Sequence, residues 1–211
     1  MNKFKIIKAF FIGLLIIGMI SPLAGQELEW QLAKDKDGIS VYTRQAEGSK
    51  LKEFKALATI NAPIEKLVAM IYNTAGYKDW MTDLKSVIQL EGSNKNELIT
   101  YTEVEIPWPA ENRDIITLYQ FKNETGNDNV RIDLTSIAGD IPEKDGLIRM
   151  TNANGFWEFT SQGNDKTYVH YQFLADPGGN IPTWLINMFI VEGPFETLNN
   201  MKNIAEGLIE P

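Results

Sequence analysis

Between residues 84 and 173 the chain repeats a single pattern of short stretches in which apolar and polar residues alternate. Alternation with a period of two is typical of strands that bury one face, and turns rich in Gly, Asn and Asp separate the stretches. The stretches are 86–90, 98–106, 113–121, 130–134, 147–150, 156–160 and 167–173. Because no helix intervenes, we predict an antiparallel meander, which excludes a doubly wound parallel sheet with a nucleotide crevice.

Two strands and two helices flank this meander. Residues 39–44 and 54–60 alternate in the same way, and Asn61-Ala-Pro63 opens a helix with one apolar stripe at Ile64, Leu67, Val68 and Ile71. A second helix is predicted from Pro182 to Gly207, apolar along one face. We expect a bend or weak joint at Gly193-Pro194, because proline lacks an N–H group and clashes one turn back. The fold class is therefore α+β.

A sheet of about eight or nine strands with one long helix creates a packing problem, because a helix only about 10 Å wide cannot cover a broad curved sheet. Either bulky side chains fill the remaining space, or an internal hydrophobic cavity is left for a ligand. Small and polar residues alternate on the expected inward face of two strands. They are Thr100, Thr102 and Val104 on one, and Ile115, Thr117 and Tyr119 on the next. The periodicity leaves two roles open for the threonines, to line a cavity or to satisfy one another.

The N-terminus reads as an export signal. Lys3, Lys5 and Lys8 precede an apolar run of residues 9–20 and a small-residue exit at Ala24-Gly25. This predicts a secretory signal peptide over residues 1–25 and a mature domain over 26–211, located in the periplasm or secreted. An uncleaved membrane anchor is the weaker alternative, because a span needs about 20 apolar residues.

Composition narrows the chemistry further. The chain has no cysteine and a single histidine, His170, so disulfides, a lipoprotein anchor and a His- or Cys-ligated metal centre are excluded, and we expect no metal or cofactor. With 20 basic and 28 acidic residues the net charge is −8, and the mature chain is more acidic still because the signal holds three lysines. Nucleic acid is therefore not an expected partner, and we expect a monomer whose contact with membranes is transient, local and apolar.

The titratable side chains do not form a catalytic set. His170 alternates against Val169, Tyr171 and Phe173 and is expected to face solvent, as are Glu103 and Glu105. No Gly-x-Ser-x-Gly motif occurs, which argues against a nucleophilic hydrolase.

Arg113 and Asp114 are adjacent on one predicted strand, so their side chains point to opposite faces. We expect Arg113 at the mouth of the cavity, and Asp114 to cap a loop or to pair with a surface lysine.

Three motifs resemble one known family. They are DPGGNIPTWLIN (176–187), IPWPAENRD (106–114) and GLIR (146–149), and together with Trp30, Val41-Tyr42 and Tyr77-Lys-Asp-Trp80 they extend the likeness over about residues 28–210. The chain resembles the START (steroidogenic acute regulatory protein-related lipid transfer) domain, and within that family its phosphatidylcholine-transfer branch. The resemblance implies a helix-grip fold, in which a curved antiparallel sheet wraps around the C-terminal helix and encloses a lipid-sized tunnel.

The resemblance also implies where a ligand would bind. The aromatic positions that grip choline in phosphatidylcholine carriers fall on Thr102, Ile115 and Ala153, none of which can make a cation-π contact. A charged arginine of several relatives is replaced by Tyr119. We therefore expect a ligand with a hydroxyl or carbonyl end, hydrogen-bonded by Tyr119, Thr102 and Thr117. Further ligand contacts are expected from Arg113, Trp184, Leu185 and Met188, with gating at Gly193 and Pro194.

These observations favour a non-enzymatic protein that binds, and transfers, a lipid or other hydrophobic small molecule. Two alternatives stay open. One is an enzyme on the same fold, similar to aromatase/cyclase relatives, which would need Arg113, Tyr119 or Tyr171 as its acid or base. The other is an envelope interaction module with a filled core and no ligand.

Overall fold

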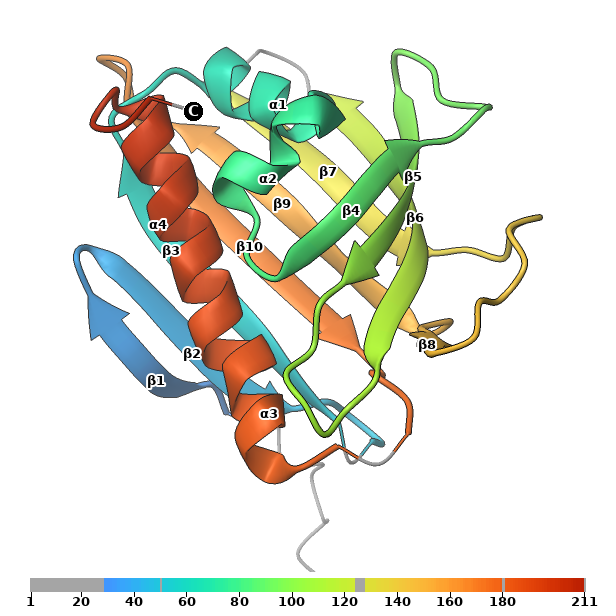
Figure 1. The fold of residues 1–211 in the computed structure, drawn as a ribbon. Coiled ribbons are helices and arrows are strands. Elements are labelled where there is room, and N and C mark those ends of the chain that lie inside the picture. Colours follow the sequence, from blue (N-terminus) through green and yellow to red (C-terminus); the bar gives the residue numbers. More distant parts are fainter. Residues whose placement is uncertain (1–28, 50, 124–127, 180, 211) are drawn as a thin grey trace, which may run out of the picture.

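The computed structural model describes residues 29–49, 51–123, 128–179 and 181–210. The predicted signal peptide, residues 1–25, lies outside this range. The described chain forms one curved sheet, with a C-terminal helix along its concave side and two short helices across one end (Figure 1). The strands are β1 (Gln31–Lys36), β2 (Ile39–Gln45), β3 (Lys52–Ile60), β4 (Leu84–Gln89), β5 (Glu97–Val104), β6 (Asn112–Asn123), β7 (Asn129–Ser136), β8 (Leu147–Arg149), β9 (Ala153–Ser161) and β10 (Thr167–Ala175).

The helices occupy two parts of the sequence. Between β3 and β4 lie α1 (Ile64–Tyr72), the 3₁₀ turn η1 (Thr74–Gly76) and α2 (Tyr77–Trp80). After β10 follow α3 (Thr183–Asn187), the π-helical turn η2 (Met188–Glu192) and α4 (Gly193–Ala205). Among the described helices none is long and apolar enough to cross a membrane.

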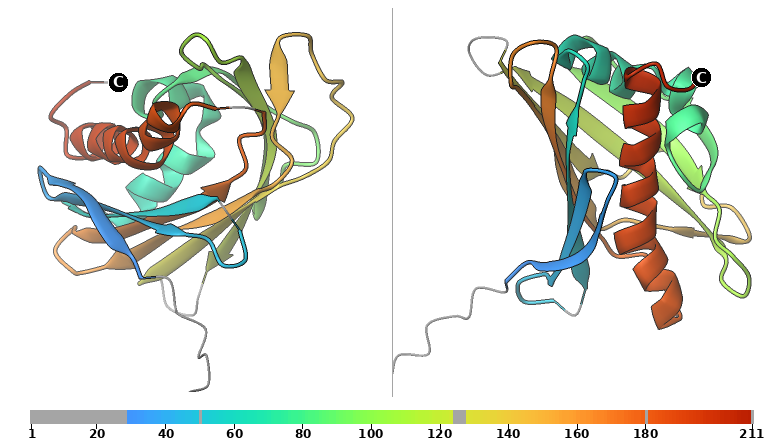
Figure 2. Two further views of the ribbon diagram at one scale, coloured as in Figure 1. Left: turned by 90° about the horizontal axis from the view of Figure 1, so that it is seen from below. Right: turned by 90° about the vertical axis from the view of Figure 1, so that its left-hand side faces the viewer.

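The sheet runs in the order β1-β2-β3-β10-β9-β7-β6-β5-β4, and all neighbours in this order are antiparallel. The predicted meander is thus confirmed for β4 to β7, β9 and β10. The first three strands join it through the pairing of β3 with β10, where Leu57 lies opposite His170. Only β8 departs from the meander, because it pairs in parallel with β6 outside the main order. In the view from below, on the left of Figure 2, the sheet curves around the C-terminal helix, as the helix-grip fold requires.

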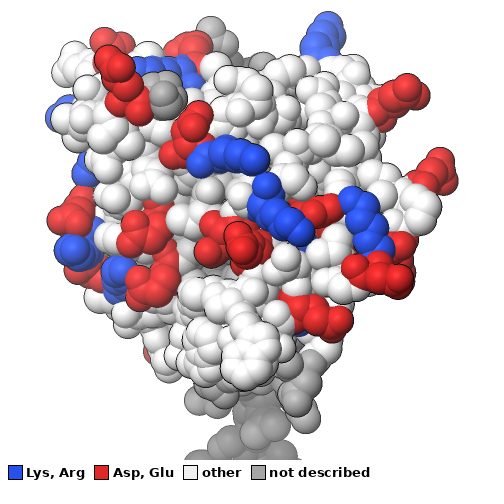
Figure 3. Space-filling view, in the orientation of Figure 1, with Lys and Arg blue, Asp and Glu red and all other residues white. Residues whose placement is uncertain are grey.

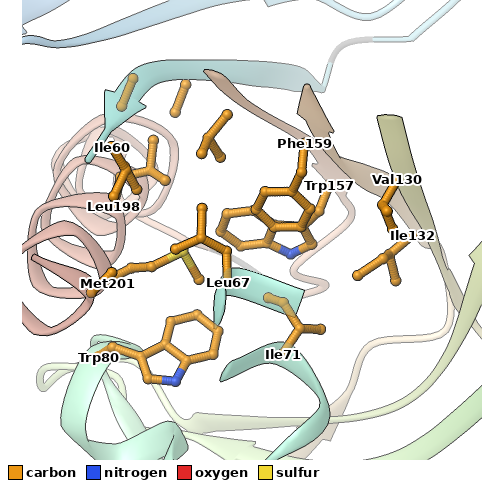
Figure 4. Close-up of a cluster of buried hydrophobic side chains, with 14 of the residues drawn as sticks. Ile60, Leu67, Ile71, Trp80, Val130, Ile132, Trp157, Phe159, Leu198 and Met201 are labelled. Atoms are coloured by element: carbon orange, nitrogen blue, oxygen red, sulfur yellow. The ribbon is translucent and has the colours of Figure 1, made fainter. Parts of the chain in front are cut away.

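One end of the molecule, which we call the closed end, is filled by side chains under α1 and α2. The spacing of Ile64, Leu67 and Ile71 places all three on the buried face of α1. They meet aromatic rings from α2 and β9 and aliphatic groups from α4 in a continuous core (Figure 4). Trp80 and Trp157 are each 3% exposed, which shows how tightly this end is packed.

The C-terminal helix is continuous but changes its winding. Asn187, Met188, Glu192 and Gly193 all have right-handed helical φ and ψ, so no break separates α3, η2 and α4. Within η2 the N–H of Gly193 donates to the carbonyl of Met188, five residues back. At Gly193-Pro194, where a bend or weak joint was predicted, the structure has a π-helical turn directly before the proline. Pro194 cannot donate a backbone hydrogen bond, which removes one of the bonds that would keep this turn α-helical.

Candidate functional site

A cavity of about 370 Å³ lies between the C-terminal helix and the sheet, at the end opposite α1. We call this the open end. Its volume lies in the lower part of the ~300–1,000 Å³ range of small-molecule sites. The lining comes from β3 and β10, from the ends of β5 and β6, from the segment after α2, and from α3, η2 and the start of α4. Its apolar residues are Leu51, Phe54, Met81, Val104, Ile106, Met150, Phe173, Ala175, Pro177, Ile186, Phe189, Ile190 and Pro194.

Tyr171 separates the cavity from the closed end. Its ring stacks on Trp157 with centroids 3.8 Å apart and planes at 3°, and the ring of Phe54 packs edge-on at 5.0 Å. Burial raises the pKa of the Tyr171 hydroxyl well above its usual range, so this group is neutral in the folded protein. It can offer a hydrogen bond to a ligand but is poorly suited to release a proton near neutral pH.

Arg113 fixes the loop that enters α3. The residue is 2% exposed, and its Nε and Nη2 donate to the carbonyls of Pro177 and Gly178, each at 3.0 Å, while Nη1 donates to the carbonyl of Glu111. Burial lowers the pKa of Arg113. In the same loop Gly178 and Gly179 have φ of 62° and 65°, a left-handed conformation that glycine adopts at little cost. Arg113 thus lines the cavity, as predicted, and also holds the loop above it.

The other polar lining residues lie mainly where the helix passes the segment after α2. The hydroxyl of Thr82 donates to the carbonyl of Gly193 at 3.2 Å and lies 3.2 Å from the hydroxyl of Thr197. These contacts attach the sheet side of the cavity to the π-helical turn. Lys52, Asp83 and Asn187 complete the polar lining.

The predicted ligand residues divide into two groups. Arg113 lines the cavity, as do Gly193 and Pro194, which were predicted as gating positions rather than ligand contacts. Thr102, Ile115, Thr117 and Tyr119 lie on the buried, inward face as expected, at 6–8% exposure, but they do not border the cavity. On this face Val104 and Arg113 are paired opposite one another at one end of the two strands and do border it. Tyr119 instead belongs to the packed core that includes Tyr77 and Trp80 of α2.

The helix residues predicted to touch ligand also do not line the cavity. Trp184 is 53% exposed, Leu185 is fully buried and Met188 is half-buried, whereas Ile186, Phe189 and Ile190 border the cavity. The three-and-four spacing assigned Leu185 and Met188 to the core-facing stripe and placed Trp184 on another side of the helix. The π-helical turn holds an extra residue, which rotates the residues before it by about 100° relative to that stripe.

The outer face of β5 and β6 is covered, which corrects two predictions. Glu103 was expected to face water, but it is 8% exposed and receives hydrogen bonds from Lys144 at 2.6 Å and Tyr101 at 3.1 Å. Asp114 was expected to cap a loop or pair with a surface lysine. It is fully buried and accepts two hydrogen bonds from Arg149, at 2.7 and 2.8 Å. The cause in both cases is the segment 137–149, which folds back over these strands and contributes β8.

His170 has the predicted direction but not the predicted exposure. It lies on the face opposite Tyr171, yet it is half-buried because the ring of Phe156 packs against it at 4.8 Å. Burial lowers its pKa, although the nearby carboxylate of Glu158 opposes the shift. Its strand position places it away from the cavity, so it has no part in this site.

A second hollow, of about 350 Å³, lies on the convex face of the sheet and is lined mainly by polar groups, among them Glu53, Arg131 and Asp133. Within the described ranges, no group of three His, Cys, Asp or Glu side chains is placed to hold a metal ion.

Two exposed tryptophans mark the open end. Trp108, in the loop between β5 and β6, is 88% exposed, and Trp184 on α3 is 53% exposed. Their neighbours Ile106 and Ile186 both line the cavity. In the space-filling view the lower tip of the molecule is free of charged side chains, while acidic and basic groups alternate above it (Figure 3). The mouth of the cavity therefore has an aromatic rim, which also includes the exposed charged residues Lys52 and Asp83.

The chain has a curved antiparallel sheet, a C-terminal helix across it and an apolar cavity between the two. These features define the helix-grip class of small-molecule-binding folds. The comparisons with known proteins place the chain within that class. The START domain model matches residues 19–207, and the chain belongs to this family.

Individual relatives and a solved structure support the same family assignment. The chain is 33% identical over 189 residues to an uncharacterized protein of Pseudomonas aeruginosa, covering 87% of this chain and 91% of the relative. It is 30% identical over 179 residues to the phosphatidylcholine transfer protein of Rattus norvegicus, covering 82% of each. A crystal structure of a STAR-related lipid transfer protein from Xanthomonas axonopodis superimposes with a TM-score of 0.75 at 32% identity, over 82% of this chain and 97% of that one.

Proposed function

We propose that this protein binds one lipid or other hydrophobic small molecule in the open-end cavity and transfers it between membranes. The observation that carries the proposal is the cavity, which is lined by thirteen apolar residues and lies beside a helix that could move. Membership of the START family and the similarity to proteins named as lipid transfer proteins support the same function.

Desolvation supplies the affinity. Each buried methylene contributes ~0.8 kcal/mol, so a chain of about ten buried methylenes gains roughly 8 kcal/mol, the free energy of a micromolar complex before ordering costs. Few directed contacts are needed for such binding. The aromatic positions required for choline are absent here, because Thr102, Ile115 and Ala153 are not aromatic and none of them borders the cavity.

Entry and exit require the helix to move, and we place the compliant point at η2 and Gly193-Pro194. The π-helical turn has fewer favourable hydrogen bonds than an α-helix, and Pro194 supplies none from its own nitrogen. Ile186, Phe189 and Ile190 precede this point and line the cavity. Motion about the turn would therefore move one wall of the cavity as a unit.

The aromatic rim gives the protein a means of meeting a membrane at the place where its ligand leaves. Trp108 and Trp184 are exposed there, and tryptophan favours the interface between water and lipid. The acidic net charge of −8 opposes broad adhesion to anionic lipid, so contact should be brief and local. With the predicted signal peptide, we place this exchange in the cell envelope.

Carriage fits the cavity better than catalysis. The hydroxyl of Tyr171 is held neutral, and three carbonyls engage Arg113. Asp83 is the remaining acid in the lining; burial and the nearby Glu105 raise its pKa, but its side chain is exposed at the rim. A product formed from a supplied ligand, and lost in Asp83→Asn or Tyr171→Phe, would identify an enzyme instead.

Mass spectrometry of lipids extracted from the purified native protein tests the proposal. We expect a stoichiometric apolar ligand in the wild-type protein and its loss from Ala175→Trp, which places a large ring in the cavity. Ala69→Trp adds the same group to the exposed side of α1 and is the matched control. Consistent emptiness of wild-type protein, together with no binding of added lipid, would contradict the proposal and favour an interaction module.

A further inference from the structure

Arg113 is a buried cation without a carboxylate partner among the described residues. Its three hydrogen bonds to described residues all go to backbone carbonyls, those of Glu111, Pro177 and Gly178. No described Asp or Glu oxygen lies within 4.0 Å of its nitrogens. The exposed Glu111 acts on Arg113 only through space, and its carboxylate raises the pKa of Arg113 less than burial lowers it. The neighbouring Asp114 is different, because it is paired with Arg149 at 2.7 Å.

Such an arrangement leaves a positive charge that is only partly compensated. Removing an ion from water costs several kcal/mol, and carbonyl dipoles recover less of this cost than a full negative charge does. A guanidinium group has five N–H donors and stays protonated in proteins, so three bonds leave two donors for another acceptor.

The cavity is the place from which that acceptor can arrive. Arg113 borders it together with apolar neighbours, including Val104, Ala175 and Pro177, and is otherwise 2% exposed. Solvent anions have little access to a group buried to this degree. A molecule already held in the cavity can bring its own charged group to Arg113 while its chain covers the apolar walls.

We propose that the ligand is an anionic single-chain amphiphile whose carboxylate or phosphate end pairs with Arg113. The inference rests on the proposed binding function and deepens it by assigning the charge of the ligand. A forked guanidinium group suits both anions, because each can accept two parallel hydrogen bonds. The volume of about 370 Å³ favours one chain over two.

Displacement of the neutral dye N-phenyl-1-naphthylamine from delipidated full-length mature protein tests this inference. The competitors share a twelve-carbon chain and differ in the head group: dodecanoate, dodecyl phosphate, dodecanol and dodecyltrimethylammonium. We expect at least one anion to bind about tenfold or more tightly than dodecanol, the size of one charge-assisted hydrogen-bonded contact, and the cation to bind most weakly. The two anions, compared with each other, distinguish a carboxylate from a phosphate.

Variants assign the preference to the residue. In Arg113→Gln the anion and the alcohol should bind within about threefold of each other, while Arg113→Lys should keep part of the preference. Arg131→Gln removes an arginine of the convex face, outside the cavity, and should leave the preference intact. If Arg113→Gln does not fold, as judged by circular dichroism, the affinities of the four competitors for the wild-type protein and for Arg113→Lys still test the inference.

Equal binding of acid and alcohol by the wild-type protein would overturn the inference, as would a preference that survives in Arg113→Gln or disappears in Arg131→Gln. In each of these cases the protein still binds chains, so the proposed function stands. Failure of the dye and of all four competitors to bind would instead reject the proposed function itself.

Discussion

The closed and open ends share one sheet and one helix, yet one is solid and the other hollow. At the closed end α1 and α2 lie over the sheet, and Trp80, Trp157 and Phe159 fill the space at 3% exposure or less. At the open end no described helix besides the C-terminal one covers the sheet, and a cavity of about 370 Å³ remains. The position of one inserted pair of helices, between β3 and β4, therefore decides which end can bind a ligand.

The comparison separates two tasks that compete in most small proteins. Close packing provides stability, whereas a ligand site requires space that close packing would remove. Here Tyr171 and Trp157, stacked at 3.8 Å, form the boundary between the two. We expect substitutions on the two sides of this boundary to have different consequences.

The largest effect should come from truncating matched aromatic side chains at the two ends. Phe159→Ala removes a fully buried ring from the closed end and should lower the free energy of unfolding by about 3–5 kcal/mol. Phe173→Ala removes a half-buried ring that borders existing space and should cost about 1 kcal/mol. Urea denaturation of both variants measures the difference. Equal losses would show that the open end is packed as tightly as the closed end in solution.

The next effect concerns the buried ion pair behind the open end. Burial alone would raise the pKa of Asp114, but hydrogen bonds from Arg149 and Tyr101 outweigh it and hold the pKa below its ordinary value. A lowered pKa in the folded state means that the unfolded chain takes up the proton first. The stabilisation is therefore present above about pH 4, the ordinary aspartate value, and is lost as the pH falls through the folded pKa.

Asp114→Asn should accordingly lower the free energy of unfolding at pH 7 by about 3 kcal/mol, because Arg149 loses its buried partner. The difference from wild type should shrink below about pH 4. Asp133→Asn is the matched control on the convex face, where the more exposed pairs with Arg131 and Lys122 should be worth less than about 1 kcal/mol. A pH-independent difference between wild type and Asp114→Asn would argue against this account.

A smaller, kinetic effect is expected at the π-helical turn. Pro194→Ala restores a backbone N–H and allows the turn to relax toward an α-helix, so transfer of a fluorescent lipid between vesicles should slow several-fold. Pro142→Ala, in an exposed loop away from the helix, is the control. An unchanged transfer rate in Pro194→Ala would remove this joint from the mechanism.

The smallest effect should be seen at the aromatic rim. Trp108→Ser and Trp184→Ser should reduce co-sedimentation with neutral vesicles while changing the free energy of unfolding by no more than about 0.5 kcal/mol. Ile88→Ser removes an apolar side chain of the same 53% exposure as Trp184, on β4, and should not affect vesicle binding. If Trp108→Ser, Trp184→Ser and Ile88→Ser all co-sediment with vesicles to the same extent, the rim has no special role at the membrane.

Much of this architecture could be predicted from the pattern of residues along the chain. Period-two alternation located the strands, and the 3,4 spacing of Ile64, Leu67 and Ile71 located α1 and its buried face. Alternation also placed Arg113 and Tyr119 on the inward side. The alternation could not predict which part of a strand would border the cavity. Tyr119 and Arg113 share a face, yet only Arg113 borders the cavity.

The other differences come from tertiary contacts with no local signal. Glu103 and Asp114 sit in strands whose outer face looks solvated until the segment 137–149 folds over it. The rotation that brings Phe189 and Ile190 to the cavity depends on one extra residue in a helical turn. Gly193-Pro194 marked the position of that irregularity but not the kind of turn that forms.

The pairing of β3 with β10 also bears on the order in which the molecule can assemble. Leu57 and His170 lie opposite one another although more than a hundred residues separate them. Contacts of such long sequence separation form late, because a large loop must close before they are made. During synthesis one edge of β3 therefore stays unpaired until nearly the whole polypeptide has been made. A truncation before β10 should yield an aggregation-prone fragment with an open strand edge rather than a smaller stable domain.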